Sequence, residues 1–434
     1  MKRRLLLKNA TIYTGYTDKV LKDHDILIID SKIAKVDKDI KDIDAKIIDC
    51  RNKFITPGLI NIHAHLFGSG IPKKSLGKSK SQDFLVRFVK TPLGHLVIRK
   101  IAKENAKKQL MGGVTTLRTS GDFEYCDIYL RDKHLNNLPR LIVPGYAITS
   151  NTGHGNGTFA ITSDNPEQLR KMVRHAKSLG VDYIKACTTG GVMDASKKGE
   201  PGEVKVSKEQ LHAIVDEAHK CGLYVASHTE SPEGVELDIK CGVDFIEHGS
   251  LFNDDLIKEI KNKNIKFTLT LTPSIPFSVL DNKITKCGSF TRYNSVIVTN
   301  NMISCAKKVL DNNIPLGLGT DAACPFSLQH LSYREMLYAQ KTLGISALKA
   351  IELMTINNAR LIGLSKLIGS IEENKYADLL VLPNDPIKDL DNFYNLDLII
   401  HNGIIFKQKR YPKFYRYEKI IKSLEIKSEY PLID

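Results

Sequence analysis

Two histidines stand two residues apart in the stretch TPGLINIHAHL, residues 56–66. The apolar residues around His63 and His65 indicate a buried strand, and burying an imidazole ring without polar partners is unfavourable. Residues i and i+2 of a strand share a face, so both rings can point to the same side. Two imidazoles on one face are typical ligands of a transition metal.

Further residues that can bind metal close other apolar, strand-like runs. The segments DYIKAC, LYVASH, DFIEH and LGLGTD contain, at or near their ends, Lys185, His228, His248 and Asp321. A single histidine at a strand end is usually structural. Four histidines and one aspartate at corresponding ends of four segments indicate a metal centre.

Lys185 interrupts a strand that heads for the interior of the protein. A buried ammonium group is unfavourable, most of all beside metal cations, and burial favours the neutral amine. A neutral amine can add carbon dioxide and become a carbamate, an anion whose two oxygens can bridge two metal ions. The position of Lys185 therefore predicts a bridged pair of ions.

Strand-like and helix-like segments alternate from about residue 58 to residue 365. Helices are predicted at 166–180, 207–222 and 231–242, and strands at 59–65, 114–120, 140–148, 182–187, 223–228, 244–248, 266–272 and 316–321. Eight such units predict an α/β fold with a (β/α)₈ TIM-type barrel, and a doubly wound open sheet is the alternative. In such barrels the active site lies at the carboxyl ends of the strands, where the six candidate ligands fall.

Both ends of the chain read as short strands separated by turns. We expect a discontinuous β-sandwich domain from residues 1–57 and 366–410, the barrel over 58–365, and a C-terminal tail over 411–434 that is a surface segment or a short helix. Substrate specificity is expected in the loops after the strands, at 66–92, 149–165, 188–206 and 273–300.

Composition narrows the classes of function. The 434 residues carry 63 Lys+Arg and 49 Asp+Glu, a net charge of +14, but the basic residues are spread along the whole chain and predict no nucleic-acid partner. No run approaches the ~20 apolar residues of a membrane span, and the N-terminus lacks a signal-peptide core. The eight cysteines form no CxxC pair and read as reduced thiols, so a cytoplasmic protein without a membrane partner is expected. The eight histidines other than His63, His65, His154, His228 and His248 are expected at the surface or on helices.

The motifs PGLINIHAH, IKACTTGG, ASH, IEHG and GTD, in this order, resemble those of the amidohydrolase superfamily. GVTTLRTSGD, TGHG and TTGGVMD are similar to the branch of imidazolonepropionase-like proteins and Xaa-Pro or Xaa-Arg/Lys dipeptidases with a carboxylated lysine. The resemblance implies two Zn²⁺ per chain and a homo-oligomer. One ion would be held by His63, His65, carboxylated Lys185 and Asp321, and the other by Lys185, His228 and His248.

The resemblance also implies a mechanism. A hydroxide that bridges the ions attacks a carbonyl carbon, and Asp321 acts first as general base and then as general acid toward the leaving nitrogen. His154, after the third strand, would donate a hydrogen bond to the carbonyl oxygen, or it is an ordinary residue of a glycine-rich loop.

Two further residues are candidates for substrate binding. Arg118 follows the second strand and either contacts substrate or forms a structural ion pair. Dipeptidase-like relatives commonly have a tyrosine two positions after the histidine of the fifth strand, where this chain has Glu230. A glutamate there would repel a substrate carboxylate, or it simply faces the positive end of the next helix.

The sequence thus predicts a binuclear zinc amidohydrolase that cleaves an amide or peptide-like C–N bond of a small substrate, such as a dipeptide or an N-acyl amino acid. The alternatives are a hydrolase or deaminase of a cyclic amide, urea or heterocycle, and a non-catalytic scaffold relative. Lys185 argues against a deaminase with one metal ion, and the complete ligand set argues against a scaffold.

Overall fold

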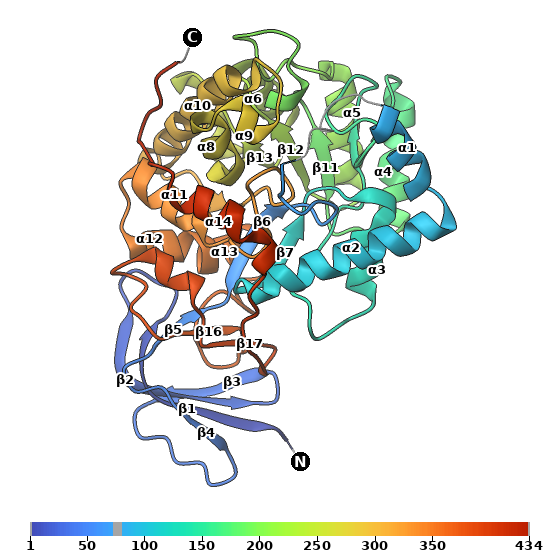
Figure 1. The fold of residues 1–434 in the computed structure, drawn as a ribbon. Coiled ribbons are helices and arrows are strands. Elements are labelled where there is room, and N and C mark those ends of the chain that lie inside the picture. Colours follow the sequence, from blue (N-terminus) through green and yellow to red (C-terminus); the bar gives the residue numbers. More distant parts are fainter. Residues whose placement is uncertain (1, 73–79, 433–434) are drawn as a thin grey trace.

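The computed structural model describes residues 2–72 and 80–432. Two layers of structure are visible: a barrel surrounded by helices and, below it in Figure 1, a sheet made from both ends of the chain. Residues 73–79, which belong to the first predicted specificity loop, lie outside the described residues.

The barrel strands run parallel and are nearly all buried, which is why their sequences are continuous apolar runs rather than alternating ones. A parallel β-bridge between Ala64 and Ala322 links the first barrel strand to the segment that follows the last barrel strand. The strands are β6 (Leu59–Ala64), β7 (Val114–Thr119), β8 (Arg140–Ile142), β9 (Ala147–Thr149), β11 (Ile184–Cys187), β12 (Val225–Thr229), β13 (Phe245–His248), β14 (Lys266–Leu269) and β15 (Leu316–Leu318), with β10 (Ala160–Thr162) beside β9. The predicted TIM-type barrel is confirmed.

Two predicted strands differ from the observed ones. The segment 140–148 forms two short strands, β8 and β9, separated by Pro144 and by Gly145, whose φ of +72° turns the chain. The segment 266–272 ends as a strand at Leu269, because the helix α8 already begins at Leu271.

The helices that follow the strands begin and end at recognisable signals. Ser207 and Gln210 form the capping box that the sequence predicts for α5, and Gly242, with φ of +80°, ends α6. The helices are α1 (Lys80–Val89), α2 (Pro92–Met111), α3 (Cys126–Asp132), α4 (Pro166–Ser178), α5 (Lys208–Lys220), α6 (Pro232–Cys241), α7 (Ile257–Asn262), α8 (Leu271–Val279), α9 (Asn282–Thr285), α10 (Thr291–Asp311), α11 (Arg334–Leu343), α12 (Ala347–Glu352), α13 (Asn358–Leu361) and α14 (Tyr415–Lys422). Short turns of helix are η1 (Phe123–Tyr125), η2 (Val192–Asp194), η3 (Asp254–Leu256), η4 (Leu353–Asn357), η5 (Leu390–Tyr394) and η6 (Pro412–Phe414).

The second sheet takes strands from both ends of the chain in the order β18-β17-β16-β5-β1-β2-β3, with β4 paired to β1. The antiparallel pair of β5 and β16 joins the two ends, with Thr56 opposite Leu380. Its members are β1 (Arg4–Tyr13), β2 (Val20–Ile29), β3 (Lys32–Asp37), β4 (Lys46–Asp49), β5 (Phe54–Pro57), β16 (Leu379–Leu382), β17 (Leu398–His401) and β18 (Ile404–Phe406). This arrangement fits the β part of the predicted fold class, while the domain limits stay a prediction.

The segment after residue 410 packs against the barrel. Phe414 and Ile421 are buried, and Glu418 accepts a hydrogen bond of 2.7 Å from His330. The side chain of His330 is only 8% exposed, and His401 of the terminal sheet is buried, so neither is the surface or helix residue that the sequence suggested. Within the described ranges, no helix combines the length and the apolar character needed to span a bilayer.

Candidate metal centre

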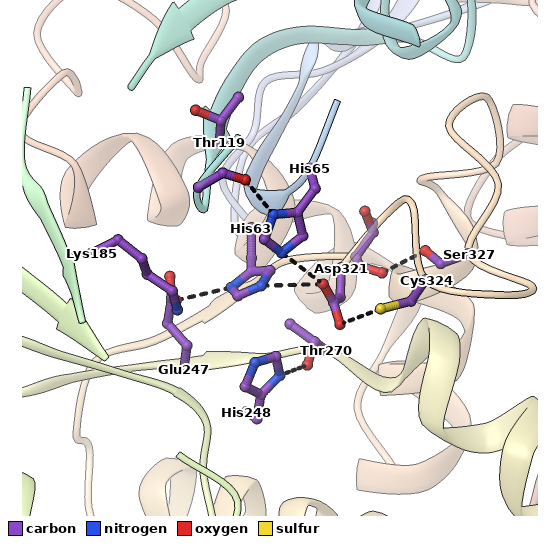
Figure 2. Close-up of polar contacts among 12 residues, drawn as sticks. His63, His65, Thr119, Lys185, Glu247, His248, Thr270, Asp321, Cys324 and Ser327 are labelled. Carbon is purple, nitrogen blue, oxygen red and sulfur yellow. Dashed lines mark hydrogen bonds and ion pairs between the residues drawn. The ribbon is translucent and has the colours of Figure 1, made fainter. Parts of the chain in front are cut away.

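The first ligand group lies where β6 ends and the chain leaves β15. Nε2 of His63 and Nε2 of His65 each lie 3.4 Å from Oδ1 of Asp321 (Figure 2). Backbone N–H groups of Thr320 and Asp321 both donate to the carbonyl of His63 at 2.9 Å, which fixes the carboxylate against the rings. His63, His65 and Asp321 offer three ligand atoms that one ion can reach.

The second ligand group comes from β12 and β13. Ring nitrogens of His228 and His248 and a carboxylate oxygen of Glu230 lie within 4.8 Å of one another. Nε2 of each histidine is buried and has no hydrogen-bond partner. Burial, strengthened by neighbouring histidines, lowers the pKa of both His228 and His248 well below the ordinary value. Neutral imidazoles with unpartnered nitrogens fit a metal ion, so the donor set agrees with the predicted second ion.

Backbone and hydroxyl partners orient two of the rings. Nδ1 of His65 lies 2.6 Å from the carbonyl of Gly121, to which it donates. Nδ1 of His248 lies 2.6 Å from Oγ1 of Thr270 (Figure 2). Such partners fix the tautomer and leave Nε2 free for a metal.

Lys185 reaches from β11 toward the same place. Its amine pairs with Oε2 of Glu247, whose other oxygen accepts a 2.7 Å hydrogen bond from Arg118. Oε2 of Glu247 also lies 3.1 Å from Nδ1 of His63. Lys185, Glu247 and Arg118 are almost completely buried, so one carboxylate faces two cations and an imidazole beneath the ligand groups.

Arg118 does not face a space that substrate could enter. Its side chain has no exposed surface, and besides Glu247 it donates to the carbonyl of Ile62 at 2.7 Å. This position favours the structural ion pair, one of the two roles that the sequence left open. Asp122 accepts hydrogen bonds from the N–H groups of Leu66 and Phe67 and holds the loop after β6.

His154 lies between β9 and β10, over the second group. Its ring stacks on His228 with centroids 4.2 Å apart, and its Nδ1 pairs with Asp194. Burial acts to lower the pKa of His154, but the carboxylate of Asp194 outweighs burial and raises it. Because Nδ1 faces Asp194, Nε2 is the ring nitrogen that remains to face a substrate.

Sequence reasoning missed three residues that lie beside the candidate ligands, Glu247, Asp194 and Cys324. It considered Glu230 for substrate binding or as a residue facing the next helix, and not for the metal. Sγ of Cys324 lies 3.1 Å from Oδ2 of Asp321, to which it donates. Glu247 had a detectable signal, an acidic residue inside an apolar strand next to His248, whereas Asp194 and Cys324 lie in loops that carry none.

Comparisons with known proteins identify the family of this chain. The profile of the amidohydrolase family matches residues 54–405. A crystal structure described as a proposed prolidase from Bifidobacterium longum is 30% identical, with a TM-score of 0.83 and coverage of 97% of this chain and 99% of that chain. A crystal structure of a Xaa-Pro dipeptidase with methionine bound in its active site is 25% identical, with a TM-score of 0.79 and coverage of 93% and 100%.

Among curated sequences, the ochratoxinase of Aspergillus niger is 24% identical over 299 residues, which cover 62% of this chain and 60% of that protein. The match thus spans less than two thirds of that relative's length. Because the family profile covers most of the chain and the two ligand groups lie at the carboxyl ends of the barrel strands, this protein belongs to the amidohydrolase family, whose members are hydrolases acting on carbon–nitrogen bonds.

Proposed function

We propose that this protein is a binuclear zinc hydrolase that cleaves the amide bond of a small substrate such as a dipeptide or an N-acyl amino acid. The proposal depends on two groups of candidate ligands that lie at the mouth of the barrel. One group is His63, His65 and Asp321, and the other contains His228 and His248. The similarity in fold and sequence to a proposed prolidase and to a Xaa-Pro dipeptidase supports a peptide-like substrate.

Lys185 is the proposed bridge between the ions, as a carbamate. The ammonium group loses one proton before its nitrogen bonds to the carbon of carbon dioxide, and the nitrogen loses a second proton afterwards, so one positive charge is exchanged for one negative charge. Two features support this step: the amine on β11 is buried, and Glu247, which pairs with Lys185, has a second cationic partner in Arg118. When bound, the ions polarise the substrate carbonyl and make water acidic enough to attack it near neutral pH.

Asp321 moves the proton in this proposal. Burial acts to raise its pKa, but the hydrogen bonds and charges of His63 and His65 hold the pKa well below the usual range, so Asp321 is ionised. It accepts the proton of the attacking water and donates it to the leaving nitrogen. His154, held by Asp194, donates from Nε2 to the carbonyl oxygen as negative charge develops there.

A second candidate is hydrolysis of a cyclic amide, a urea or a heterocycle. The observation that favours it is the carboxylate of Glu230 beside His228, which would repel a substrate carboxylate. The cytoplasmic location and the homo-oligomeric state stay predictions.

A hydrolysis screen tests the proposed function. Protein loaded with zinc in the presence of bicarbonate is incubated with dipeptides, N-acyl amino acids and cyclic amides, and product amines are quantified. Hydrolysis of the first two groups, abolished by a chelator, is the expected result. Activity on cyclic amides alone favours the second candidate, and no hydrolysis by fully loaded protein would contradict both.

A further inference from the structure

We propose that Glu230 is a direct ligand of the second metal ion, together with His228 and His248. This inference rests on the proposed binuclear centre. It assigns the residue that replaces the tyrosine of dipeptidase-like relatives to the metal rather than to the substrate.

The backbone directs Glu230 toward the metal site. Glu230 comes one residue after β12 and two after His228, and residues two apart along a strand share a face. Thr229, between them, points the other way and pairs with Asp238. The N–H of Glu230 donates to Oγ1 of Thr189 at 3.0 Å, which anchors the chain as it leaves the strand.

The side chain is also held in place. Oε2 of Glu230 accepts a 2.9 Å hydrogen bond from the backbone N–H of Val192. A carboxylate has lone pairs on two oxygens, so this single bond leaves it able to bind a cation. A Glu230 oxygen and nitrogens of His228 and His248 lie within 4.8 Å of one another. Zinc–ligand bonds of about 2.0–2.2 Å place ligand atoms of one ion up to roughly 4 Å apart, so little closure is needed.

The distribution of charged ligands between the two ions also supports Glu230 as a ligand of the second ion. The first group already contains the carboxylate of Asp321, whereas His228 and His248 are neutral ligands. With Lys185 shared between the two ions, the second ion would otherwise have no anion of its own. Glu230 gives each divalent ion one protein carboxylate, which strengthens binding in a buried site.

Metal-binding measurements test the role of Glu230 without relying on turnover. Zinc stoichiometry and affinity are determined by competition with a chromophoric chelator for the wild type and Glu230→Gln. Glu233→Gln is the matched control, because Glu233 is exposed in the first turn of the next helix. Outer partners of metal ligands typically contribute 10–100-fold in affinity, so loss of a direct ligand should weaken the second ion by ~100-fold or more.

The expected pattern is specific to one site. Glu230→Gln should lose affinity for the second zinc ion and keep the first unchanged, which also shows that the variant is folded, while Glu233→Gln should match the wild type. If Glu230→Gln binds two ions with wild-type affinities, the proposed role of Glu230 is wrong, and the proposed function is not affected. A wild type that binds fewer than two ions would overturn this inference together with the proposed function.

A spectroscopic measurement adds a second readout. In protein loaded with Co²⁺, the visible absorption reports the number and type of ligands. The spectrum of the second ion should change in Glu230→Gln and be partly restored in Glu230→Asp, which keeps a carboxylate. Identical spectra of the wild type and Glu230→Gln would contradict direct ligation.

Discussion

Oε2 of Glu247 lies 3.1 Å from Nδ1 of His63, and both side chains are buried inside the barrel. The same carboxylate faces Arg118 and Lys185. Glu247 therefore balances the cations beside the candidate metal centre, and it faces Nδ1 of His63 while Nε2 of that ring faces Asp321.

Glu247→Gln should destabilise the metal-free protein. Removing one partner of a buried ion pair leaves an uncompensated charge and typically costs about 3–5 kcal/mol of unfolding free energy. Urea unfolding followed by circular dichroism measures the loss. The control is Glu236→Gln, which removes the partner of Lys240 in a half-exposed pair on α6 and should change little. Equal effects of the two substitutions would contradict the balancing role of Glu247.

Asp378→Asn should weaken the contact between the terminal sheet and the barrel in a pH-dependent way. Asp378 accepts hydrogen bonds from Arg140 at 2.9 Å and from the N–H of Asn402 at 2.8 Å, and its Oδ1 lies 2.9 Å from Nδ1 of His401. Burial opposes its ionisation, but His401 and Arg140 outweigh burial and lower its pKa from 3.8 to about 2.

A carboxylate with a lowered pKa contributes stability that is complete well above pH 4 and is lost as the pH falls toward 2. The wild type should exceed Asp378→Asn in unfolding free energy by about 2 kcal/mol at pH 7 and by roughly half as much at pH 3. Urea titrations at several pH values measure this difference. A difference that does not change between pH 7 and pH 3 would refute the ionic origin of the stabilisation.

Asp321→Asn should abolish most hydrolysis while sparing the fold. An amide can still offer an oxygen to a metal ion, but it cannot take and return a proton, and general acid–base catalysis contributes typically ~10²–10⁴-fold. Steady-state kinetics and zinc content are measured on the same preparation. A variant with full zinc content and near wild-type kcat would show that another residue moves the proton.

His154→Ala should lower kcat more than it changes KM, because a donor to the developing negative charge acts mainly in the transition state. Loss of one such donor costs about 10²–10³-fold in kcat. Asp194→Asn, which keeps His154 but removes its anionic partner, should cause a smaller loss. If His154→Ala raised KM alone, the residue would bind substrate without assisting the reaction.

The barrel and the grouping of the candidate metal ligands were predictable because each depends on local sequence. His63 and His65 share a face by strand periodicity, and His228, His248 and Asp321 follow apolar runs that form parallel strands. Helices with clear caps, such as α5 after Ser207, were equally recognisable.

Glu247 stands out as an acidic residue in an apolar strand, but its contacts and the pairing of Asp194 were not predictable, because they depend on a break in that periodicity and on loops. Alternation would place Glu247 and His248 on opposite faces of β13, but His248 has φ of +69°, and both side chains reach the interior. The pairing of His154 with Asp194 joins two loops 40 residues apart, and no local pattern specifies it.

A crystal structure of the protein grown with zinc and bicarbonate, with anomalous data at the zinc edge, tests the central claim most directly. Two zinc peaks are expected, one on His63, His65 and Asp321 and one on His228 and His248, with a carboxylated Lys185 between them. One peak or none, with an unmodified Lys185 still paired to Glu247, would contradict the binuclear centre.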